Sequence, residues 1–231
     1  REGAVIGLVS NVGKGEFAGM VKLKLPTIGE NIESTWARVL TPGGGPTRGL
    51  QLMPSVDDEV LVVFENGDLR RPFVLGGLWN PKDKLPLPEF LTGSAVTQWT
   101  LKDTAGHALT FRSGDGDAKR NVEILLADGS TKLFLGQDKV ELWATSGKTL
   151  ELKSGEGSIK ITADGSIEIT GTKVTITGKQ EIAAKAPNVK VNADAAMSLN
   201  SSATLELKSS ASATLDGGGM TTVKGGMVKI N

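Results

Sequence analysis

The sequence predicts an all-β protein, with a small five-stranded barrel at the N-terminus and an intertwined homotrimeric β-helix needle after it. Two observations carry this prediction. In the first 80 residues, short alternating apolar and polar segments are separated by Gly, Pro and Asn turn signals. From Ser158 to Asn231 the chain repeats in steps of seven or eight residues, each with two apolar positions flanking one polar or small residue. The prediction places the barrel at 1–80, a neck at 81–100, the start of the needle at 101–157 and the regular needle at 158–231.

The barrel is expected to contain five strands. They are predicted at Ala4–Val12, Gly19–Leu25, Thr35–Leu40, Glu59–Glu65 and Phe73–Leu78. Glu65-Asn66-Gly67-Asp68 predicts a hairpin, because Asn and Gly tolerate the positive φ values of a type I′ turn. Five short strands in a segment of this length are typical of an OB-fold. The prolines at 86 and 88 stiffen the segment that follows, which is interpreted as the neck.

The regular needle is predicted from its apolar pairs. They are Ile159/Ile161, Ile167/Ile169, Val174/Ile176, Ile182/Ala184, Val189/Val191, Met197/Leu199, Leu205/Leu207, Ala213/Leu215, Thr221/Val223 and Val228/Ile230. Side chains alternate along a strand, so each pair lies on one face. One chain closing a β-helix needs about 20 or more residues per coil, whereas eight residues supply a single face. Three identical chains would bring the pairs together on a shared axis, which predicts a homotrimer.

The segment before the regular needle carries the same kind of pair at wider spacing. These pairs are Leu109/Phe111, Val122/Ile124, Leu133/Leu135, Val140/Leu142 and Leu150/Leu152. Phe111, Phe134 and Trp143 are expected to fill the wide base of a tapering shaft. Between the apolar positions of the needle, charged residues such as Lys160, Glu168, Lys173, Lys190 and Glu206 are expected to face solvent.

Composition excludes several classes of function. The formal net charge is +0 and there is no tyrosine, which argues against the basic, aromatic groove of a nucleic-acid-binding OB protein. The chain has no cysteine, so disulfides and thiolate metal sites are not available. No run reaches transmembrane length. A secretory signal peptide is not expected, because no basic, apolar segment with a small-residue cleavage site is recognised. We expect no cofactor and no bound metal.

Two motifs resemble catalytic or nucleotide sites but favour structural interpretations. His107 is the single histidine, so a catalytic triad or a three-histidine metal site in the trimer would have to use it. The neighbouring Ala105-Gly106 favours a turn instead. Gly43-Gly44-Gly45-Pro46 lacks the Gly-Lys-Ser/Thr of a phosphate-binding loop, which indicates a flexible barrel loop.

Two further features could bind ligands. Ser113–Ala118 contains two carboxylates that could hold calcium, but it lacks the other ligands of an EF-hand loop and favours a polar turn. The four tryptophans could stack ligands, although core or trimer packing is the favoured interpretation. They are Trp36, Trp79, Trp99 and Trp143.

Four segments resemble a known family. Pro54–Asn80, with the sequence PSVDDEVLVVFENGDLRRPFVLGGLWN, resembles the OB-domain signature of the VgrG and phage baseplate assembly protein V spikes. Gly7–Val12 is similar to the start of that domain. Ala105-Gly106-His107 resembles the entry to its trimeric β-helix, and Lys224–Asn231 is similar to VgrG C-termini.

The resemblance implies the central spike of a contractile injection machine, which is a phage tail, a type VI secretion system or an extracellular injection particle. It implies a homotrimer that a contracting sheath drives through a target membrane, with baseplate hub or tube proteins at its N-terminal end and possible effector cargo. The hub portion would come from another protein or from a preceding segment, and Thr41–Gly49 is a candidate contact loop. Synthesis in the bacterial cytoplasm and delivery outside the cell are also implied. No enzymatic activity is expected, because the lysozyme domain of one phage relative has no counterpart here.

The C-terminus is the candidate docking site for a tip partner, which the resemblance implies to be a PAAR-type protein. The docking residues would be Met227, Val228, Lys229, Ile230 and Asn231. Their apolar side chains would form a triangular end in the trimer. The alternative is that they form the last buried layer of the needle. Because the tail contains no histidine, no metal is expected at the tip.

Two other functions stay open at this point. One is a carbohydrate-active or receptor-binding β-helical tail fibre, although the needle offers no obvious acidic pair for glycoside hydrolysis. The other is a nucleic-acid-binding OB protein, against which the charge balance argues.

Overall fold

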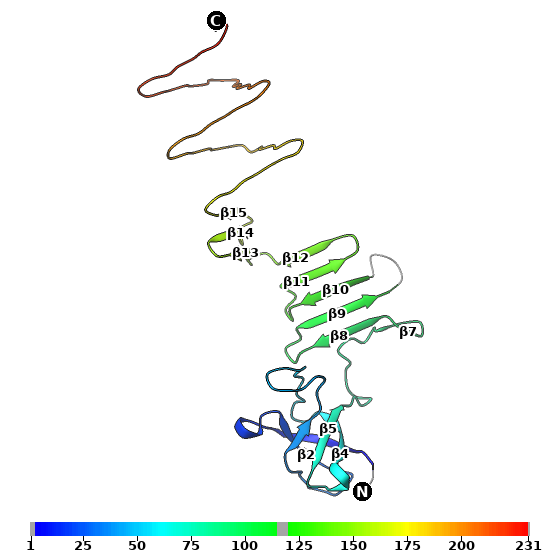
Figure 1. The fold of residues 1–231 in the computed structure, drawn as a ribbon. Coiled ribbons are helices and arrows are strands. Elements are labelled where there is room, and N and C mark those ends of the chain that lie inside the picture. The colour runs from blue at the N-terminus through cyan, green and yellow to red at the C-terminus, as the bar shows by residue number, and fades with distance from the viewer. Residues whose placement is uncertain (1–2, 115–119, 231) are drawn as a thin grey trace. The chain divides into compact units, whose positions relative to one another are not determined.

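The structure is a computed structural model that describes residues 3–114 and 120–230. The chain divides into two compact units, Arg1–Thr172 and Lys173–Asn231. Every strand of the described residues lies in the first unit (Figure 1). The two helical elements are single 3-10 turns, η1 at Gly15–Phe17 and η2 at Glu65–Gly67. The prediction of an all-β chain is confirmed.

The N-terminal strands form a closed barrel in the order β1-β2-β3-β5-β4. The strands are β1 (Val5–Val12), β2 (Met20–Lys24), β3 (Ala37–Val39), β4 (Glu59–Phe64) and β5 (Pro72–Gly77). β3 and β5 pair in parallel, while the other neighbours pair antiparallel. Each strand lies within or one residue beyond its predicted range, so the five-stranded OB-type barrel is confirmed.

Alternation along the strands builds the barrel core. One side of each strand points inward, and the fully buried side chains of the core are at most 2% exposed. The core consists of Val9, Val21, Leu23, Leu25, Ala37, Val60, Val62 and Val74. Gly7 lies where β1 approaches this core, and a Cβ atom there would come within 2.9 Å of a Val62 methyl. The barrel therefore closes on a tightly packed aliphatic core.

The Asn66-Gly67 turn has the predicted geometry. Asn66 has a φ of 51° and Gly67 a φ of 76°, the positive values that a type I′ turn requires. The Asp68 amide donates to the Glu65 carbonyl at 3.0 Å. A second turn follows, in which the Arg71 amide donates to the Asp68 carbonyl at 2.9 Å. The connection is therefore longer than a two-residue hairpin loop, and β5 begins only at Pro72.

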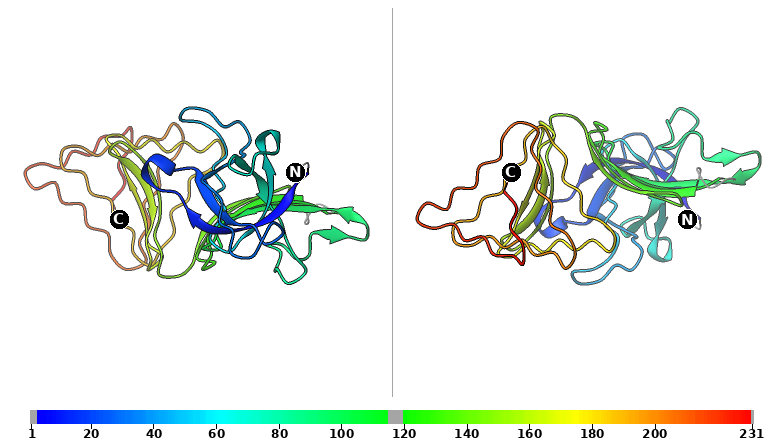
Figure 2. Two further views of the ribbon diagram at one scale, coloured as in Figure 1. Left: turned by 90° about the horizontal axis from the view of Figure 1, so that it is seen from below. Right: turned by 90° about the horizontal axis from the view of Figure 1, so that it is seen from above.

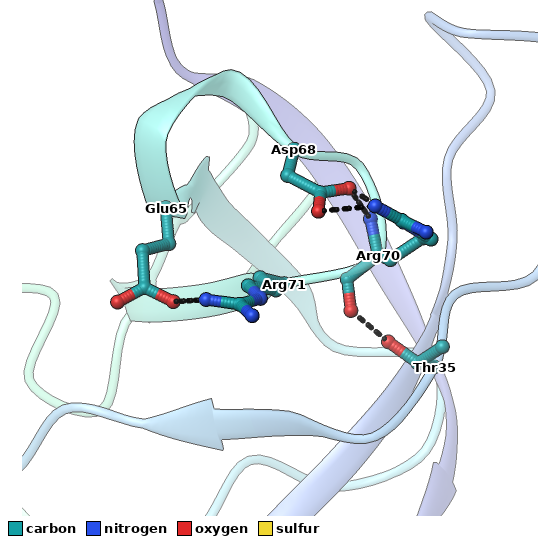
Figure 3. A network of polar contacts seen from close by, with 5 residues as sticks. All are labelled: Thr35, Glu65, Asp68, Arg70 and Arg71. Carbon is teal, nitrogen blue, oxygen red and sulfur yellow. Dashed lines mark hydrogen bonds and ion pairs between the residues drawn. The ribbon is translucent and has the colours of Figure 1, made fainter.

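Ion pairs stabilise this double turn (Figure 3). Asp68 receives two hydrogen bonds from the Arg70 guanidinium, at 3.0 and 2.9 Å, and one from the Arg70 amide at 3.0 Å. Arg71 contacts Glu65 at 3.2 Å. The Thr35 hydroxyl donates to the Arg70 carbonyl at 2.9 Å, which ties the turn to the segment before β3. The hydrogen bonds from the Arg70 side chain, followed by that from its amide, lower the pKa of Asp68 from 3.8 to about 2.

This geometry predicts how the turn responds to acid. A carboxyl group with a depressed pKa stabilises the fold above its unfolded pKa, and the contribution is lost as the pH falls through the folded pKa. The Asp68 contribution is thus complete above pH 3.8 and lost toward pH 2. Arg70→Ala is expected to raise the pKa of Asp68 toward 3.8, measured by the carboxyl carbon shift in an acid titration. Arg71→Ala is the control with a much smaller effect, and an unchanged pKa in Arg70→Ala would contradict the assignment.

The predicted neck, residues 81–100, contains more structure than a linker. β6 (Leu91–Thr92) and β7 (Ala95–Val96) form a small antiparallel hairpin. Gly93 occupies its turn with a φ of 61°. β8 (Gln98–Lys102) then begins inside the predicted neck. The proline-rich part before Glu89 has no strand among its described residues.

Two antiparallel sheets follow the neck. The first has the order β12-β11-β10-β9-β8. Its further strands are β9 (Ala108–Ser113), β10 (Arg120–Leu125), β11 (Thr131–Gly136) and β12 (Val140–Ala144). Both views of Figure 2 show this sheet edge-on as a single layer. The second sheet is a three-stranded meander of β13 (Leu150–Ser154), β14 (Gly157–Ile161) and β15 (Ile167–Thr170).

The second unit, as far as the structure describes it, contains no strand. Its side chains are exposed throughout residues 173–230. Among its described residues, one hydrogen bond joins two backbone groups, from the Met220 amide to the Gly217 carbonyl at 3.3 Å. The single chain therefore does not form the β-helix by itself, and the needle remains a prediction that requires partner chains. No helix in the described parts of the chain is long and apolar enough to cross a membrane.

Candidate assembly surface

The predicted apolar pairs lie in register across the β8–β12 sheet. One row of cross-strand neighbours consists of Trp99, Phe111, Val122, Leu135 and Val140, and the second consists of Leu101, Leu109, Ile124, Leu133 and Leu142. Residues that pair directly across antiparallel strands point to the same face. The two rows together are called the apolar face of this sheet.

The apolar face is uncovered in the single chain. Trp99 is 68% exposed and Val140 71% exposed, and Phe111, Ile124 and Leu142 are exposed as well. Contiguous exposed apolar surface of this kind is rare on monomeric soluble proteins and marks an interaction site. The sheet thus presents a continuous apolar surface for another chain.

The opposite face of the same sheet is polar. Thr100 and Thr110 share a hydrogen bond of 3.0 Å, and Arg112 contacts Glu123 at 3.2 Å. The Glu141 carboxylate forms ion pairs with the ammonium groups of Lys139, at 2.7 Å, and Lys132, at 3.3 Å. The hydrogen bond from Lys139, followed by that from Lys132, lowers the pKa of Glu141. One face is suited to water and the other to a partner.

The structure corrects the predicted positions of two aromatic residues. Phe134 and Trp143 were expected to fill the base of the shaft, but they lie on the polar face, because their strand neighbours Leu133, Leu135 and Leu142 occupy the apolar one. The Lys132 ammonium is 5.7 Å from the Phe134 ring and 5.4 Å from the Trp143 ring. This cation–π geometry holds both rings on the solvent side. Phe111 does lie on the apolar face, as predicted.

The β13–β15 meander repeats the same design. Leu150, Ile161 and Ile167 form one cross-strand row, and Leu152, Ile159 and Ile169 form the other. On the opposite face Lys160 contacts Glu168 at 3.6 Å. The charged residues between the apolar positions therefore point away from the apolar face here, as the sequence predicts.

The candidate tip residues are exposed and are not gathered into a site. Met227 is 88% and Ile230 90% exposed, and Val228 and Lys229 are exposed too. Asn231 lies outside the described residues. The docking surface formed by three copies of this segment stays a prediction.

His107 has a structural contact in this chain. Its Nδ1 accepts a hydrogen bond from the Ala127 amide at 3.0 Å. Its own amide donates to Asp103 Oδ1 at 2.8 Å. The ring therefore joins the β8–β9 turn to the β10–β11 turn. Among the described residues no group of three or more His, Cys, Asp or Glu side chains is placed to hold a metal ion.

The remaining sequence motifs are dispersed. Gly45 of the glycine-rich segment 43–46 forms an isolated antiparallel bridge with Arg48, and the Thr41 hydroxyl donates a hydrogen bond to the Leu50 carbonyl. The calcium candidate Ser113–Ala118 lies outside the described residues from position 115 onward. Trp36 stacks on Phe17 at 4.9 Å, whereas Trp79 is 71% exposed. Trp79 and Trp99 line one apolar pocket together with Phe90. The other motifs lie apart, and the apolar faces are the principal candidate site.

Comparison with known proteins agrees with the barrel. Residues 5–79 match the family of the Type VI secretion system/phage-baseplate injector OB domain, a range that contains all five barrel strands. The chain is also similar to the actin cross-linking toxin VgrG1 of Vibrio cholerae serotype O1 (strain ATCC 39541 / Classical Ogawa 395 / O395), with 27% identity over 170 residues. This similarity covers 71% of the chain but spans only 15% of the relative's length.

Proposed function

We propose that the chain is the homotrimeric central spike of a contractile injection machine, because its residues 5–79 match the injector OB-domain family of type VI secretion systems and phage baseplates. The observation that carries the proposal is the unpartnered apolar face, which continues in pattern from the β8–β12 sheet into the meander and the octads. Burying such surface releases about 25 cal/mol per Å². Three copies arranged about one axis would bury these faces against each other.

The tail supports the same proposal through its backbone. Residues 173–230 are exposed and, as far as the structure describes them, form almost no hydrogen bonds between backbone groups of the chain. Unpaired amides and carbonyls become costly once they are buried, so an apolar needle requires strand partners for them. In an interwound trimer the neighbouring chains supply those partners, and no sheet edge remains open along the shaft.

The proposed mechanism is mechanical. Sheath contraction would push the trimer tip-first through a target membrane, and its polar outer face would keep it soluble beforehand. Removing one chain from an interwound shaft requires breaking a long series of strand pairings at once, so the shaft resists axial load. No step of this mechanism involves bond chemistry, and we propose that this chain is structural. The toxin activity in the relative's name belongs to that much longer protein.

At its two ends the spike is proposed to contact different partners. The barrel end would join baseplate hub or tube proteins, with the Thr41–Gly49 loop as a contact. The C-terminal end would seat a PAAR-type tip protein on Met227, Val228, Lys229, Ile230 and Asn231, together with any effector cargo. The high exposure of Met227 and Ile230 supports an apolar docking surface there.

The tip assignment predicts loss of partner binding on charge insertion. Met227→Asp with Val228→Asp would place six carboxylates on the trimer end, and we expect a purified PAAR-type protein to be no longer retained in a pull-down. Met220→Asp is the matched control, since alternation with Thr221 and Val223 turns Met220 outward. Retention equal to that of the unaltered protein would show that these residues are only the last layer of the needle.

A further inference from the structure

The octads by themselves do not determine how three chains align. A shift of one residue would turn every apolar pair outward. A shift of a whole octad, in contrast, places Val189/Val191 where Met197/Leu199 would lie, and moves each later pair onto the next. Between Val189 and Leu215 the pairs recur every eight residues. Such a slip keeps every pair on the axis and removes strand pairing only at the ends.

Contacts within the tail do not correct this ambiguity. The described side-chain hydrogen bonds after Lys173 join residues two or three positions apart, as in Asn200 to Ser198 at 3.1 Å and Gly218 to Asp216 at 2.8 Å. The ion pair of Lys208 with Glu206 is equally local. None of these contacts links one octad to another, so alignment has to come from a part of the chain whose strand pairing is fixed within one chain.

The β13–β15 meander is such a part. Its two turns differ in sequence, and its pairing is fixed residue by residue from Leu150↔Ile161 to Ile161↔Ile167. Two backbone hydrogen bonds of 2.9 Å close the β14–β15 turn. The Thr162 amide donates to the Ser166 carbonyl, and the Gly165 amide donates to the Thr162 carbonyl. Asp164 Oδ1 accepts from the Ser166 amide at 3.1 Å and from the Thr162 hydroxyl.

The meander contains the first two apolar pairs of the repeat, Ile159/Ile161 and Ile167/Ile169, and ends before the third. β15 ends at Thr170, and the first octad pair after it begins at Val174. Three identical meanders packed by their apolar faces would place Val174 of each chain at the same level. The octads would then wind from a common start.

We propose that the β13–β15 meander, residues Leu150–Thr170, is a register clamp that sets the alignment of the three tails. This inference rests on the proposed trimer. It assigns to the meander a function separate from piercing or tip binding, which is to exclude octad-shifted assemblies.

Cysteine cross-linking reports the register directly, because the chain has no cysteine of its own. An interwound shaft has three faces, and the successive octads of one chain lie on successive faces. Each octad also lies one strand spacing, ~4.8 Å, further along the shaft axis than the octad before it. Equivalent residues of aligned chains therefore lie on different faces. A slip of one octad brings them onto adjacent strands, within the ~4.4–6.8 Å between Cα atoms that a disulfide allows.

The decisive experiment uses mixed trimers. A long chain carries a second copy of residues 197–204 inserted after Thr204, and it is co-expressed with the unaltered chain under two affinity tags. Lys190→Cys reports the register of the chains before the insertion, and Glu206→Cys reports it after the insertion. Each of these residues lies between the two members of an apolar pair. If the clamp sets the register, oxidised mixed trimers cross-link at position 206 but not at 190. Cross-linking at 190 but not at 206 would show that the C-terminal end sets the register and would overturn the proposal.

A second test covers the case in which long chains do not enter mixed trimers. Asp164→Ala with Gly165→Val disrupts the β14–β15 turn, since Gly165 has a φ of 86° that a β-branched residue rarely adopts. Asp216→Ala with Gly218→Val is the matched control, an equivalent Asp-supported turn within the tail. We expect trimers of the first variant to cross-link at both 190 and 206, and trimers of the control at neither.

If the Asp164→Ala, Gly165→Val variant forms trimers that do not cross-link at 190 or 206, the proposal of a register clamp is wrong, while the spike proposal stands. A monomeric unaltered protein would contradict the trimer itself. The mass of the unaltered protein therefore separates failure of the proposed function from failure of this inference.

Discussion

Leu199→Asp is expected to convert the protein from a trimer into monomers. In the proposed needle, Leu199 is the second member of the Met197/Leu199 pair and points to the shared axis, so the change places three carboxylates beside each other in an apolar interior. The effective cost of burying an unpaired ion is several kcal/mol, and it applies here to each of three chains. Sedimentation velocity would measure the loss of the trimer.

The matched control for Leu199→Asp is Ser198→Asp. Ser198 lies between the two apolar residues and would face solvent, where a carboxylate is well hydrated. The control should remain a trimer. Equal dissociation in both variants would mean that the two sides of the octad strand are not distinguished by burial, which contradicts an interwound core.

Leu23→Ala is expected to produce the largest loss of stability in the barrel. Leu23 is 0% exposed at the centre of the aliphatic core. Truncating a buried leucine removes its transfer free energy and leaves a cavity, which together cost about 2–5 kcal/mol. Native-state hydrogen exchange of the β1–β5 amides would report this as a lower free energy of opening.

The control for the barrel is Leu75→Ala on β5. Leu75 is 40% exposed and lies outside the core, so its truncation should lower the free energy of opening by much less. A loss in Leu23→Ala no larger than in Leu75→Ala would contradict the assignment of the core.

The barrel could be predicted from the sequence because each of its strands is half-buried within one chain. Val60 and Val62 alternate with partly exposed neighbours, and Asn66-Gly67 marks the turn. The β6–β7 hairpin was missed because each of its strands is only two residues long. Thr92-Gly93-Ser94 was the turn signal available for it.

The faces of the β8–β12 sheet were predicted only in part. The pairs such as Leu133/Leu135 were recognised, and they do lie together on the apolar face. Phe134 was assigned to the interior by its apolarity, although it alternates with those leucines. Lys132 and Glu141, which hold the polar face together, carried the missing signal. Cross-strand register distinguishes these cases, and composition does not.

The tail marks the limit of prediction from one chain. Its octads predict strands, yet the described residues after Thr170 form none. In the proposed trimer, their hydrogen-bond partners belong to other copies. For the same reason, contacts within one chain do not bring Met227 and Ile230 into a docking surface.

The most direct test of the proposed spike is the absolute mass in solution, measured by light scattering after size exclusion together with the hydrodynamic radius. An interwound trimer predicts three times the 24.1 kDa of one chain, with a radius larger than that of a compact particle of this mass. A compact monomer would contradict the trimer, because eight-residue repeats could not then close a shared β-helix.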